Sequence, residues 1–172
     1  MKSKVADWLT GVPIETADGV FVARYSQQGL AVLDFPSRSG RGSPGGKPVA
    51  VPKQVRAFHR LTASALKRVL AGRAPGPLPP LDLSAGTNFQ QHVWGELRNI
   101  ASGGTRSYGE IAKAIGKPKA VRAVGGACGA NPIPVLVPCH RVLAANRKLG
   151  GFSGGLPWKV KLLNREGIGI SG

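Results

Sequence analysis

A proline-rich segment divides this chain into two parts. Residues 74–86, APGPLPPLDLSAG, contain four prolines and two glycines. Proline has no backbone N–H to give to a helix or a sheet, so we predict an irregular linker here. We expect an N-terminal part at residues 1–80 and a C-terminal part at residues 81–172, two small units that share a boundary.

The N-terminal part has the pattern of a small sheet followed by a helix. Residues 20–35, VFVARYSQQGLAVLDF, alternate between apolar and polar side chains and predict two strands around a turn at 26–29. Residues 54–71 place apolar side chains at helical spacing, and Gly72 ends this helix. Residues 36–53 are rich in Gly, Pro and Ser and carry four bases, which predicts a loop. Its charges either contact a phosphate backbone or belong to a solvated insertion.

The C-terminal part is predicted to be mainly helical. Residues 88–100 have an apolar helical face. Ser107 and Glu110 fit a capping box, which starts a second helix that ends at Gly116. After a short turn, residues 120–130 form a third helix. Two short helices joined by a tight turn are typical of a helix-turn-helix, although many helical hairpins share the pattern. The fold class expected for the whole chain is α/β, of the α+β kind.

The charge balance favours a polyanionic partner, most simply nucleic acid. The chain has 24 Lys+Arg against 8 Asp+Glu, a formal net charge of +16. The helix at 120–130 offers small residues, with Arg122 as its one long polar side chain. Such a helix either packs closely on a neighbour or lets its backbone approach a groove, with little readout of bases. Arg122 either contacts a phosphate or fills the space left by an extruded base.

A thiol stands beside an imidazole after the apolar run IPVLV, residues 133–137. Pro138 is expected to end a buried strand there and to leave Cys139 and His140 at a turn. A free thiol has a pKa of about 8.5, and His140, Arg141 and the positive field are expected to favour the thiolate. Because neighbouring side chains need not share a face, a water between the two groups is the alternative to a direct bond.

A histidine that acts as a base needs a group that orients it. Among the acids of the second half, Glu110 is committed to the helix cap and Glu96 belongs to a distant helix. Glu166 is therefore the candidate. The alternative is that Glu166 lies on the surface and pairs with Arg165 or Lys161.

The two cysteines do not make a disulfide framework, which favours a reducing, intracellular compartment, and we expect the cytoplasm. Cys128 is expected to be an inert core thiol on an apolar helix face. The three scattered histidines show no zinc spacing, so no metal and no cofactor is expected. No stretch approaches the ~20 apolar residues of a membrane span, and no membrane partner is expected.

The second half resembles the O6-alkylguanine-DNA alkyltransferases, also called methylated-DNA–protein-cysteine methyltransferases. Several independent motifs occur in the order of that family. The first half resembles the family only as a small sheet-plus-helix domain of ribonuclease-H-like fold. The matching motifs are TNFQQHVW (87–94), SYGEIAKAIG (107–116), RAVGGACGANP (122–132), PCHRV (138–142) and GGFSGGLPWKVKLLNREG (150–167).

The resemblance implies repair of DNA by irreversible, single-turnover transfer of the alkyl group from O6-alkylguanine, and from O4-alkylthymine, to Cys139. His140 would withdraw the thiol proton through a water, and Glu166 would orient His140. Asn131 would tie the second helix of the helix-turn-helix to the active-site strand. Tyr108 would help to rotate the phosphate and would donate a hydrogen bond to the leaving guanine.

The same resemblance implies how DNA and the flipped base are held. Arg122 would replace the flipped nucleotide, and Ala123 and Gly125 would lie on the same DNA-binding helix. Ser153 and the backbone of Val142 would line the guanine pocket. The expected partner is double-stranded DNA that carries O6-alkylguanine, bound by a monomer with little dependence on sequence; cooperative binding along DNA is left open.

Two departures from the family and two rival functions remain. Some members carry zinc in the first domain, and the missing cysteines exclude that site here. The basic loop at 36–53 has no counterpart that we can place.

A lesion-binding module without transfer would differ in lacking a reactive thiol, and Cys139 argues against it. A thiol hydrolase using Cys139 and His140 would give no reason for the helix-turn-helix or the charge.

Overall fold

The computed structural model describes residues 11–37 and 50–170. Most of the predicted basic loop at 36–53 therefore lies outside the described residues. In the described part of the chain, no helix combines the length and the apolar character that crossing a membrane requires.

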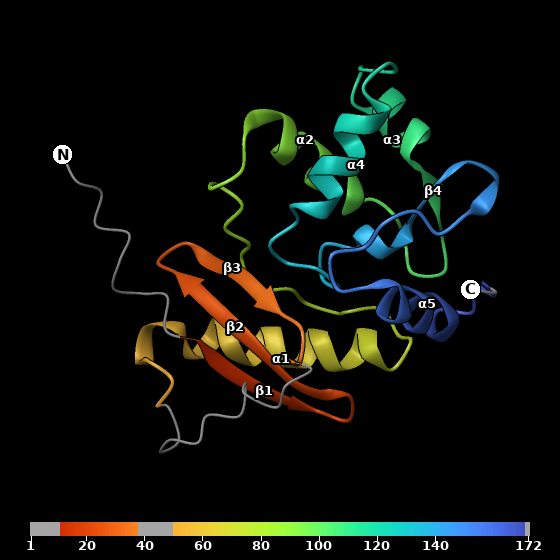
Figure 1. The fold of residues 1–172 in the computed structure, drawn as a ribbon. Helices are drawn as coiled ribbons and strands as arrows, with labels where there is room; N and C mark the ends of the chain where they lie inside the picture. The colour runs from red at the N-terminus through yellow and green to blue at the C-terminus, as the bar shows by residue number, and fades with distance from the viewer. Residues whose placement is uncertain (1–10, 38–49, 171–172) are drawn as a thin grey trace.

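The N-terminal part is a three-stranded antiparallel sheet with a long helix on one face (Figure 1). The strands are β1 (Val12–Thr16), β2 (Gly19–Ser26) and β3 (Gly29–Asp34), in that order across the sheet. The helix α1 (Arg56–Leu70) follows a short 3₁₀ turn, η1 (Lys53–Val55). The two strands and the helix predicted from the pattern are confirmed. The sequence pattern missed β1, whose Pro13 is tolerated because β1 is an edge strand.

The C-terminal part is mainly helical, and the predicted α/β class is confirmed. Its helices are α2 (Asn88–Leu97), α3 (Tyr108–Ala114), α4 (Val121–Gly129) and α5 (Leu156–Arg165). Two short parallel strands, β4 (Arg106–Ser107) and β5 (Val142–Leu143), pair with each other. The 3₁₀ turns are η2 (Cys139–Arg141) and η3 (Ala145–Arg147). The short turn between α3 and α4 gives the helix-turn-helix arrangement (Figure 1).

Polar caps explain where two of these helices begin. The predicted capping box of α3 is present: the Ser107 side chain accepts from the Glu110 N–H, and Glu110 accepts from the Ser107 N–H. The helix α2 has a second capping box, between Thr87 and Gln90. Each box satisfies two backbone donors that the first turn of a helix leaves open.

The two parts meet along the outer edge of β3. The Leu30 N–H donates to the Pro80 carbonyl at 2.9 Å, and the Asp82 N–H donates to the Leu30 carbonyl at 2.8 Å. Farther along the same strand, the Leu33 N–H donates to the Pro132 carbonyl at 2.9 Å. The linker is thus irregular, as its prolines predict, but its backbone covers the edge of the sheet.

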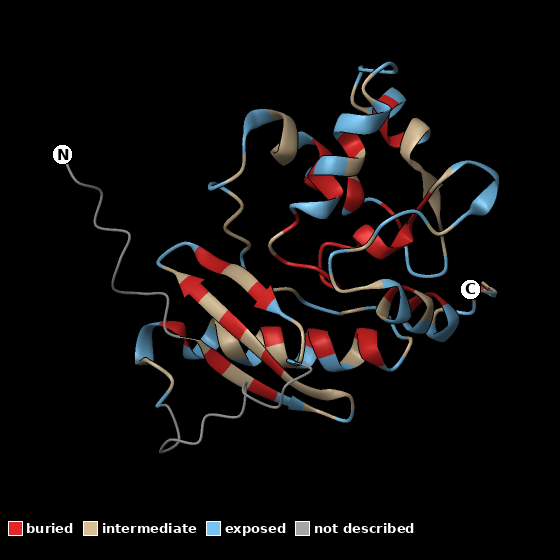
Figure 2. Cartoon of the chain, in the orientation of Figure 1, coloured by how far each residue is buried: buried red, intermediate tan, exposed pale blue. Residues whose placement is uncertain are grey.

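Buried residues of both parts form one hydrophobic core, and aromatic side chains packed against it also connect the parts (Figure 2). The Phe35 ring, just after β3, lies 5.7 Å from the Phe152 ring and 5.1 Å from the Trp158 ring of α5. Phe21 of β2 lies 5.6 Å from Trp158. A Cβ on Gly154 would come within 2.5 Å of the Phe35 ring, so glycine permits this close packing. The N-terminal sheet therefore supports the segment around Phe152.

The predicted buried strand at 133–137 is wrong. These residues are buried, but they form turns, with an α-turn bond from the Val137 N–H to the Ile133 carbonyl at 2.9 Å. Prolines precede, interrupt and follow the run, so it lacks the donors of a regular ladder. The Asn131 side chain supplies the missing bonds: it accepts from the Ile133 N–H at 3.0 Å and donates to the Val137 carbonyl at 2.8 Å.

Candidate active site

A cavity of about 540 Å³ lies between α4, the start of α3 and the segment at 151–153. Its wall contains both cysteines of the chain and four of the residues expected to hold DNA or guanine, Tyr108, Arg122, Gly125 and Ser153. Much of the rest of the wall is glycine backbone. The lining residues are Tyr108, Val121, Arg122, Gly125, Cys128, Gly129, Cys139, Gly151, Phe152 and Ser153.

Cys139 is the first residue of the 3₁₀ turn η2, and it is only 3% exposed. A reactant can therefore reach its thiol only from the cavity. Burial raises the pKa of the Cys139 thiol, while a hydrogen bond with Asn131 and the charge of Lys159 act in the opposite direction. The charge of Lys159 does favour the thiolate, as expected of a neighbouring cation, but burial outweighs it. Arg141, which was also expected to act on the sulfur, is bound to Glu166.

His140, Glu166 and Arg141 form a buried network. His140 Nε2 lies 3.0 Å from Glu166 Oε1. Arg141 donates from Nε to Glu166 Oε2 at 2.9 Å and from Nη2 to Oε1 at 2.7 Å, while Nη1 donates to the Ile100 carbonyl at 2.6 Å. The Glu166 side chain is 1% exposed. Burial alone would raise the pKa of Glu166, but the bonds from His140 and Arg141 outweigh it and lower the pKa to about 2.

The surface alternative for Glu166 is wrong. The two bases considered as its surface partners, Lys161 and Arg165, instead pair with Asp18 of the N-terminal part, at 3.5 and 2.6 Å. Glu166 is held instead by Arg141, which the sequence reasoning did not place in the site. Arg141 immediately follows His140 in the motif, and its position there gave no indication that its side chain turns toward Glu166.

The bond to Glu166 defines the chemical state of His140. An ionised carboxylate only accepts, so His140 Nε2 carries the proton and Nδ1 is left as an acceptor. Burial lowers the pKa of His140, against the opposing effect of Glu166, so the ring is neutral at neutral pH. Among the described residues, Nδ1 is the one buried side-chain nitrogen or oxygen atom without a hydrogen-bond partner. His140 is therefore set up to accept a proton, and the water relay to Cys139 stays a prediction.

Lys159 of α5 is a component of the site that sequence reasoning missed. The side chain is fully buried, and Nζ donates to the carbonyls of Val142 at 2.7 Å, Gly151 at 3.1 Å and Leu149. Burial lowers the pKa of Lys159 to about 8, and its charge acts on the Cys139 thiol. The lysine lies three and four residues before two buried leucines of α5, so its position on an apolar stripe was the available indication.

Tyr108 begins α3 and faces the active-site segment. Its hydroxyl is 3.5 Å from the Gly151 carbonyl, and burial raises the pKa of the phenol to about 12. Tyr108 is therefore a neutral donor at physiological pH. Gly150 adopts a φ of +68°, and a Cβ there would lie 2.8 Å from the Tyr108 hydroxyl. A glycine is needed at this position both for the backbone and for the space occupied by the tyrosine.

The remaining predicted residues are divided between the cavity and the surface. Ser153 and Gly125 line the cavity, whereas Val142 does not, and the Val142 carbonyl accepts from Lys159. Arg122 is exposed and also lines the cavity, and Ala123 is exposed beside it on α4. Close packing of α4 on a neighbour is observed, because its buried face packs under α2 with the Trp94 Nε1–H bonded to the α4 backbone at 2.8 Å. The approach of the α4 backbone to a groove stays a prediction.

Cys128 is buried on α4, as predicted, but it also lines the cavity, which was not predicted. Burial raises its pKa to about 12. No group of three or more His, Cys, Asp and Glu within residues 11–37 and 50–170 is arranged to hold a metal ion.

Comparisons with known proteins identify the relatives of this chain. Residues 88–168 match the family described as "6-O-methylguanine DNA methyltransferase, DNA binding domain". The methylated-DNA–protein-cysteine methyltransferase of Methanosarcina acetivorans is 40% identical over 159 residues, which cover 89% of this chain and 95% of that protein. The protein of the same name from Saccharomyces cerevisiae is 50% identical over 94 residues, so the chain spans about half the length of that relative.

A solved structure extends the likeness to both parts of the chain. The crystal structure of Mycobacterium tuberculosis OGT in complex with DNA superimposes with a TM-score of 0.74 and 38% identity, and the match covers 91% of each chain. The structure of an O6-methylguanine DNA methyltransferase from Methanococcus jannaschii matches with a TM-score of 0.64 at 26% identity, over 94% of this chain and 96% of that one. The chain belongs to the methylated-DNA–protein-cysteine methyltransferase family.

Proposed function

We propose that this protein repairs duplex DNA by transferring the alkyl group from O6-alkylguanine to Cys139, once per molecule. O4-alkylthymine, which carries the same kind of O-alkyl bond, belongs to the same substrate class. One observation carries the proposal: the Cys139 thiol, otherwise buried among the described residues, lines a cavity walled by the second helix of a helix-turn-helix. The names and DNA complex of its relatives support DNA as the partner.

The proposed reaction moves one proton and two electron pairs. His140 Nδ1 takes the thiol proton, directly or through a water, and Glu166 stabilises the resulting imidazolium. The thiolate then attacks the alkyl carbon, a C–S bond forms, and the C–O electron pair passes to the guanine oxygen. Tyr108 is the neutral donor that hydrogen-bonds the leaving base, which takes up a proton. Lys159 stabilises the thiolate with its charge.

The raised pKa of Cys139 suits a protein that reacts once. Burial raises the pKa of the sulfur and so disfavours the reactive thiolate, which limits its reaction with other electrophiles. Forming the thiolate costs ~1.4 kcal/mol for each unit by which the Cys139 pKa lies above the pH. His140, as the base that takes the proton, and the charge of Lys159 offset part of this cost. The product is a thioether, which water does not cleave, so the sulfur is not regenerated.

Because Cys139 is buried, the damaged nucleobase must leave the DNA double helix to reach it. A base stacked in a duplex cannot reach a sulfur that is 3% exposed at the inner end of a cavity. The exposed Arg122 at the cavity wall is placed to occupy the vacated position in the stack. The proposal takes a monomer on duplex DNA as the working unit.

The direct test is to incubate the protein with a duplex that carries O6-methylguanine and to determine the mass of the peptide with Cys139. Trypsin releases residues 123–141 as one peptide with both cysteines, so fragmentation between Cys128 and Cys139 must locate the methyl group. We expect one methyl group per protein, on Cys139. An unmodified peptide from a protein that binds the lesion tightly would instead support a binding module. Turnover on esters or peptides would support a thiol hydrolase.

Arg122→Ala should slow repair of duplex DNA by about tenfold or more, because stacking of a side chain on bases is worth ~1–3 kcal/mol. Reaction with free O6-methylguanine base should change little, since the free base needs no extrusion. Single-turnover rates on the two substrates measure the difference.

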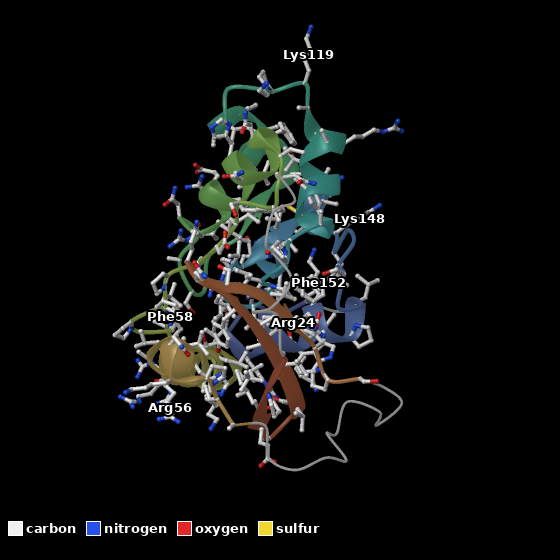
Figure 3. All side chains as sticks on the ribbon, turned by 90° about the vertical axis from the view of Figure 1, so that its left-hand side faces the viewer. Arg24, Arg56, Phe58, Lys119, Lys148 and Phe152 are labelled. Carbon is white, nitrogen blue, oxygen red and sulfur yellow. The ribbon has the colours of Figure 1, made fainter. Side chains whose placement is uncertain are left out.

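The control for this prediction is Lys119→Ala, at an exposed base on the turn before α4 that points away from the cavity (Figure 3). Its duplex rate should stay close to that of the wild type. Equal losses on duplex and free base with Arg122→Ala would remove the proposed role of this arginine in extrusion.

A further inference from the structure

A second concentration of positive charge lies outside the helix-turn-helix. Residues 50–81 contain six bases and no acid, whereas residues 105–131, which include α3 and α4, contain five bases and one acid. If the basic character served only the DNA held by α4, the excess would be expected around α4. The positive charge of residues 50–81, which include α1, is therefore not explained by DNA bound at α4.

Four of these bases form a stripe along α1 and the turn before it. Arg56, Arg60 and Lys67 lie on α1 at spacings of four and seven residues, which places them on one side of the helix. Lys53 lies in η1, just before α1, and all four bases are exposed. The opposite side of α1 is buried against the sheet. From Arg56 to Lys67 the stripe extends about 16 Å at 1.5 Å per residue. We call these four residues the α1 stripe.

No acid neutralises the α1 stripe. None of the ion pairs within residues 11–37 and 50–170 includes any of its four members. Arg56 donates only to a backbone carbonyl, that of Val51 at 3.2 Å. A row of like charges without acidic neighbours is destabilised by its own repulsion, and a polyanion relieves that repulsion. Duplex DNA offers about one negative charge per 1.7 Å of its axis, which matches a straight row of cations.

The α1 stripe and the helix-turn-helix lie at opposite ends of the molecule. In Figure 1 α1 is at the bottom and α3 and α4 are at the top, and in Figure 3 Arg56 and Lys119 mark the same two ends after a quarter turn. A duplex that lies along α4 does not pass the outer side of α1. The charge on α1 is therefore available to a separate segment of nucleic acid.

We propose that the α1 stripe binds the phosphate backbone of a second DNA duplex segment while α4 holds the first. The inference rests on the proposed function only in taking DNA as the partner. A protein that holds two segments passes from one to the other without full release. This would speed the search for rare damaged bases without changing the chemistry at Cys139.

Native mass spectrometry of the full chain with two undamaged duplexes of different mass tests the proposal. The wild type should form a species with one protein and two duplexes. The combined variant Lys53→Ala, Arg56→Ala, Arg60→Ala and Lys67→Ala should lose this species by about tenfold or more, because its phosphate contacts are removed. The complex with one duplex should remain. The matched control exchanges Lys for Arg and Arg for Lys at the same positions and should keep the two-duplex species.

Two outcomes would overturn the proposal: an undiminished two-duplex species in the alanine variant, or two-duplex species that always contain two proteins. Methyl transfer from a short damaged duplex, measured in parallel, should proceed at the wild-type rate in the alanine variant. Absence of transfer in the wild type would instead refute the proposed repair function, and the duplex count would still decide the role of the α1 stripe.

Discussion

Replacing Cys139 with alanine should abolish alkyl transfer and leave binding to damaged duplex intact. In the proposed reaction the sulfur is the acceptor, and it is buried, whereas the face of α4 that would hold DNA is exposed. The result is not trivial, because a second thiol, Cys128, lines the same cavity. Burial raises the pKa of both thiols, to about 12 for Cys128, so their pKa values do not separate them. Cys139 differs in its hydrogen bond with Asn131 and in its place next to His140, which is why we expect it to be the acceptor.

The measurement is the methyl content of residues 123–141 after incubation with O6-methylguanine duplex, together with duplex affinity by titration. Cys128→Ala is the matched control and should retain full transfer to Cys139. A methyl group found on Cys128 in the Cys139→Ala protein would show that the cavity offers two acceptors. Loss of duplex binding in the same variant would show that the sulfur also holds DNA.

The elements that the sequence predicted well are those whose determinants are local. The boundaries of α3 follow from Ser107 and Glu110, which meet within one turn of helix. The strands β2 and β3 follow from alternation around a turn that ends at Gly29. In each case the residues that define the element are close in sequence, so the local sequence pattern is enough to predict the element.

The misses depend on packing that the local pattern does not show. The run at 133–137 has the composition of a strand, but its place in the core leaves no partner strand, and Asn131 completes its hydrogen bonds instead. Lys159 is buried against three carbonyls that lie 8 to 17 residues earlier in the chain. The pKa of Cys139 depends on the same packing, since burial outweighs the positive charges that the sequence displays.

Glu166→Gln should slow alkyl transfer by about 10² or more and should also lower stability. Gln can accept only through its amide oxygen, and it cannot hold His140 and the buried Arg141 guanidinium with a negative charge. General-base contributions are typically 10²–10⁴, and removing one member of a buried ion pair costs ~3–5 kcal/mol. Single-turnover kinetics, at a temperature where the variant is fully folded, measure the effect on transfer. Thermal unfolding measures the effect on stability. Glu15→Gln, at an exposed position of β1, is the matched control and should change neither.

The pH dependence of stability separates the role of Glu166 from a packing effect. Its folded pKa of about 2 is below the ordinary value of 4.5, so its charge stabilises the fold fully above 4.5, and this contribution is lost as pH falls toward 2. A shift of that size corresponds to ~3 kcal/mol. The wild type should therefore lose stability steeply between pH 4.5 and 2, while Glu166→Gln should show a shallower loss from a lower starting value. Parallel pH curves for the two proteins would mean that Glu166 carries no special charge in the fold, and His140 would then lack the partner that makes it a base.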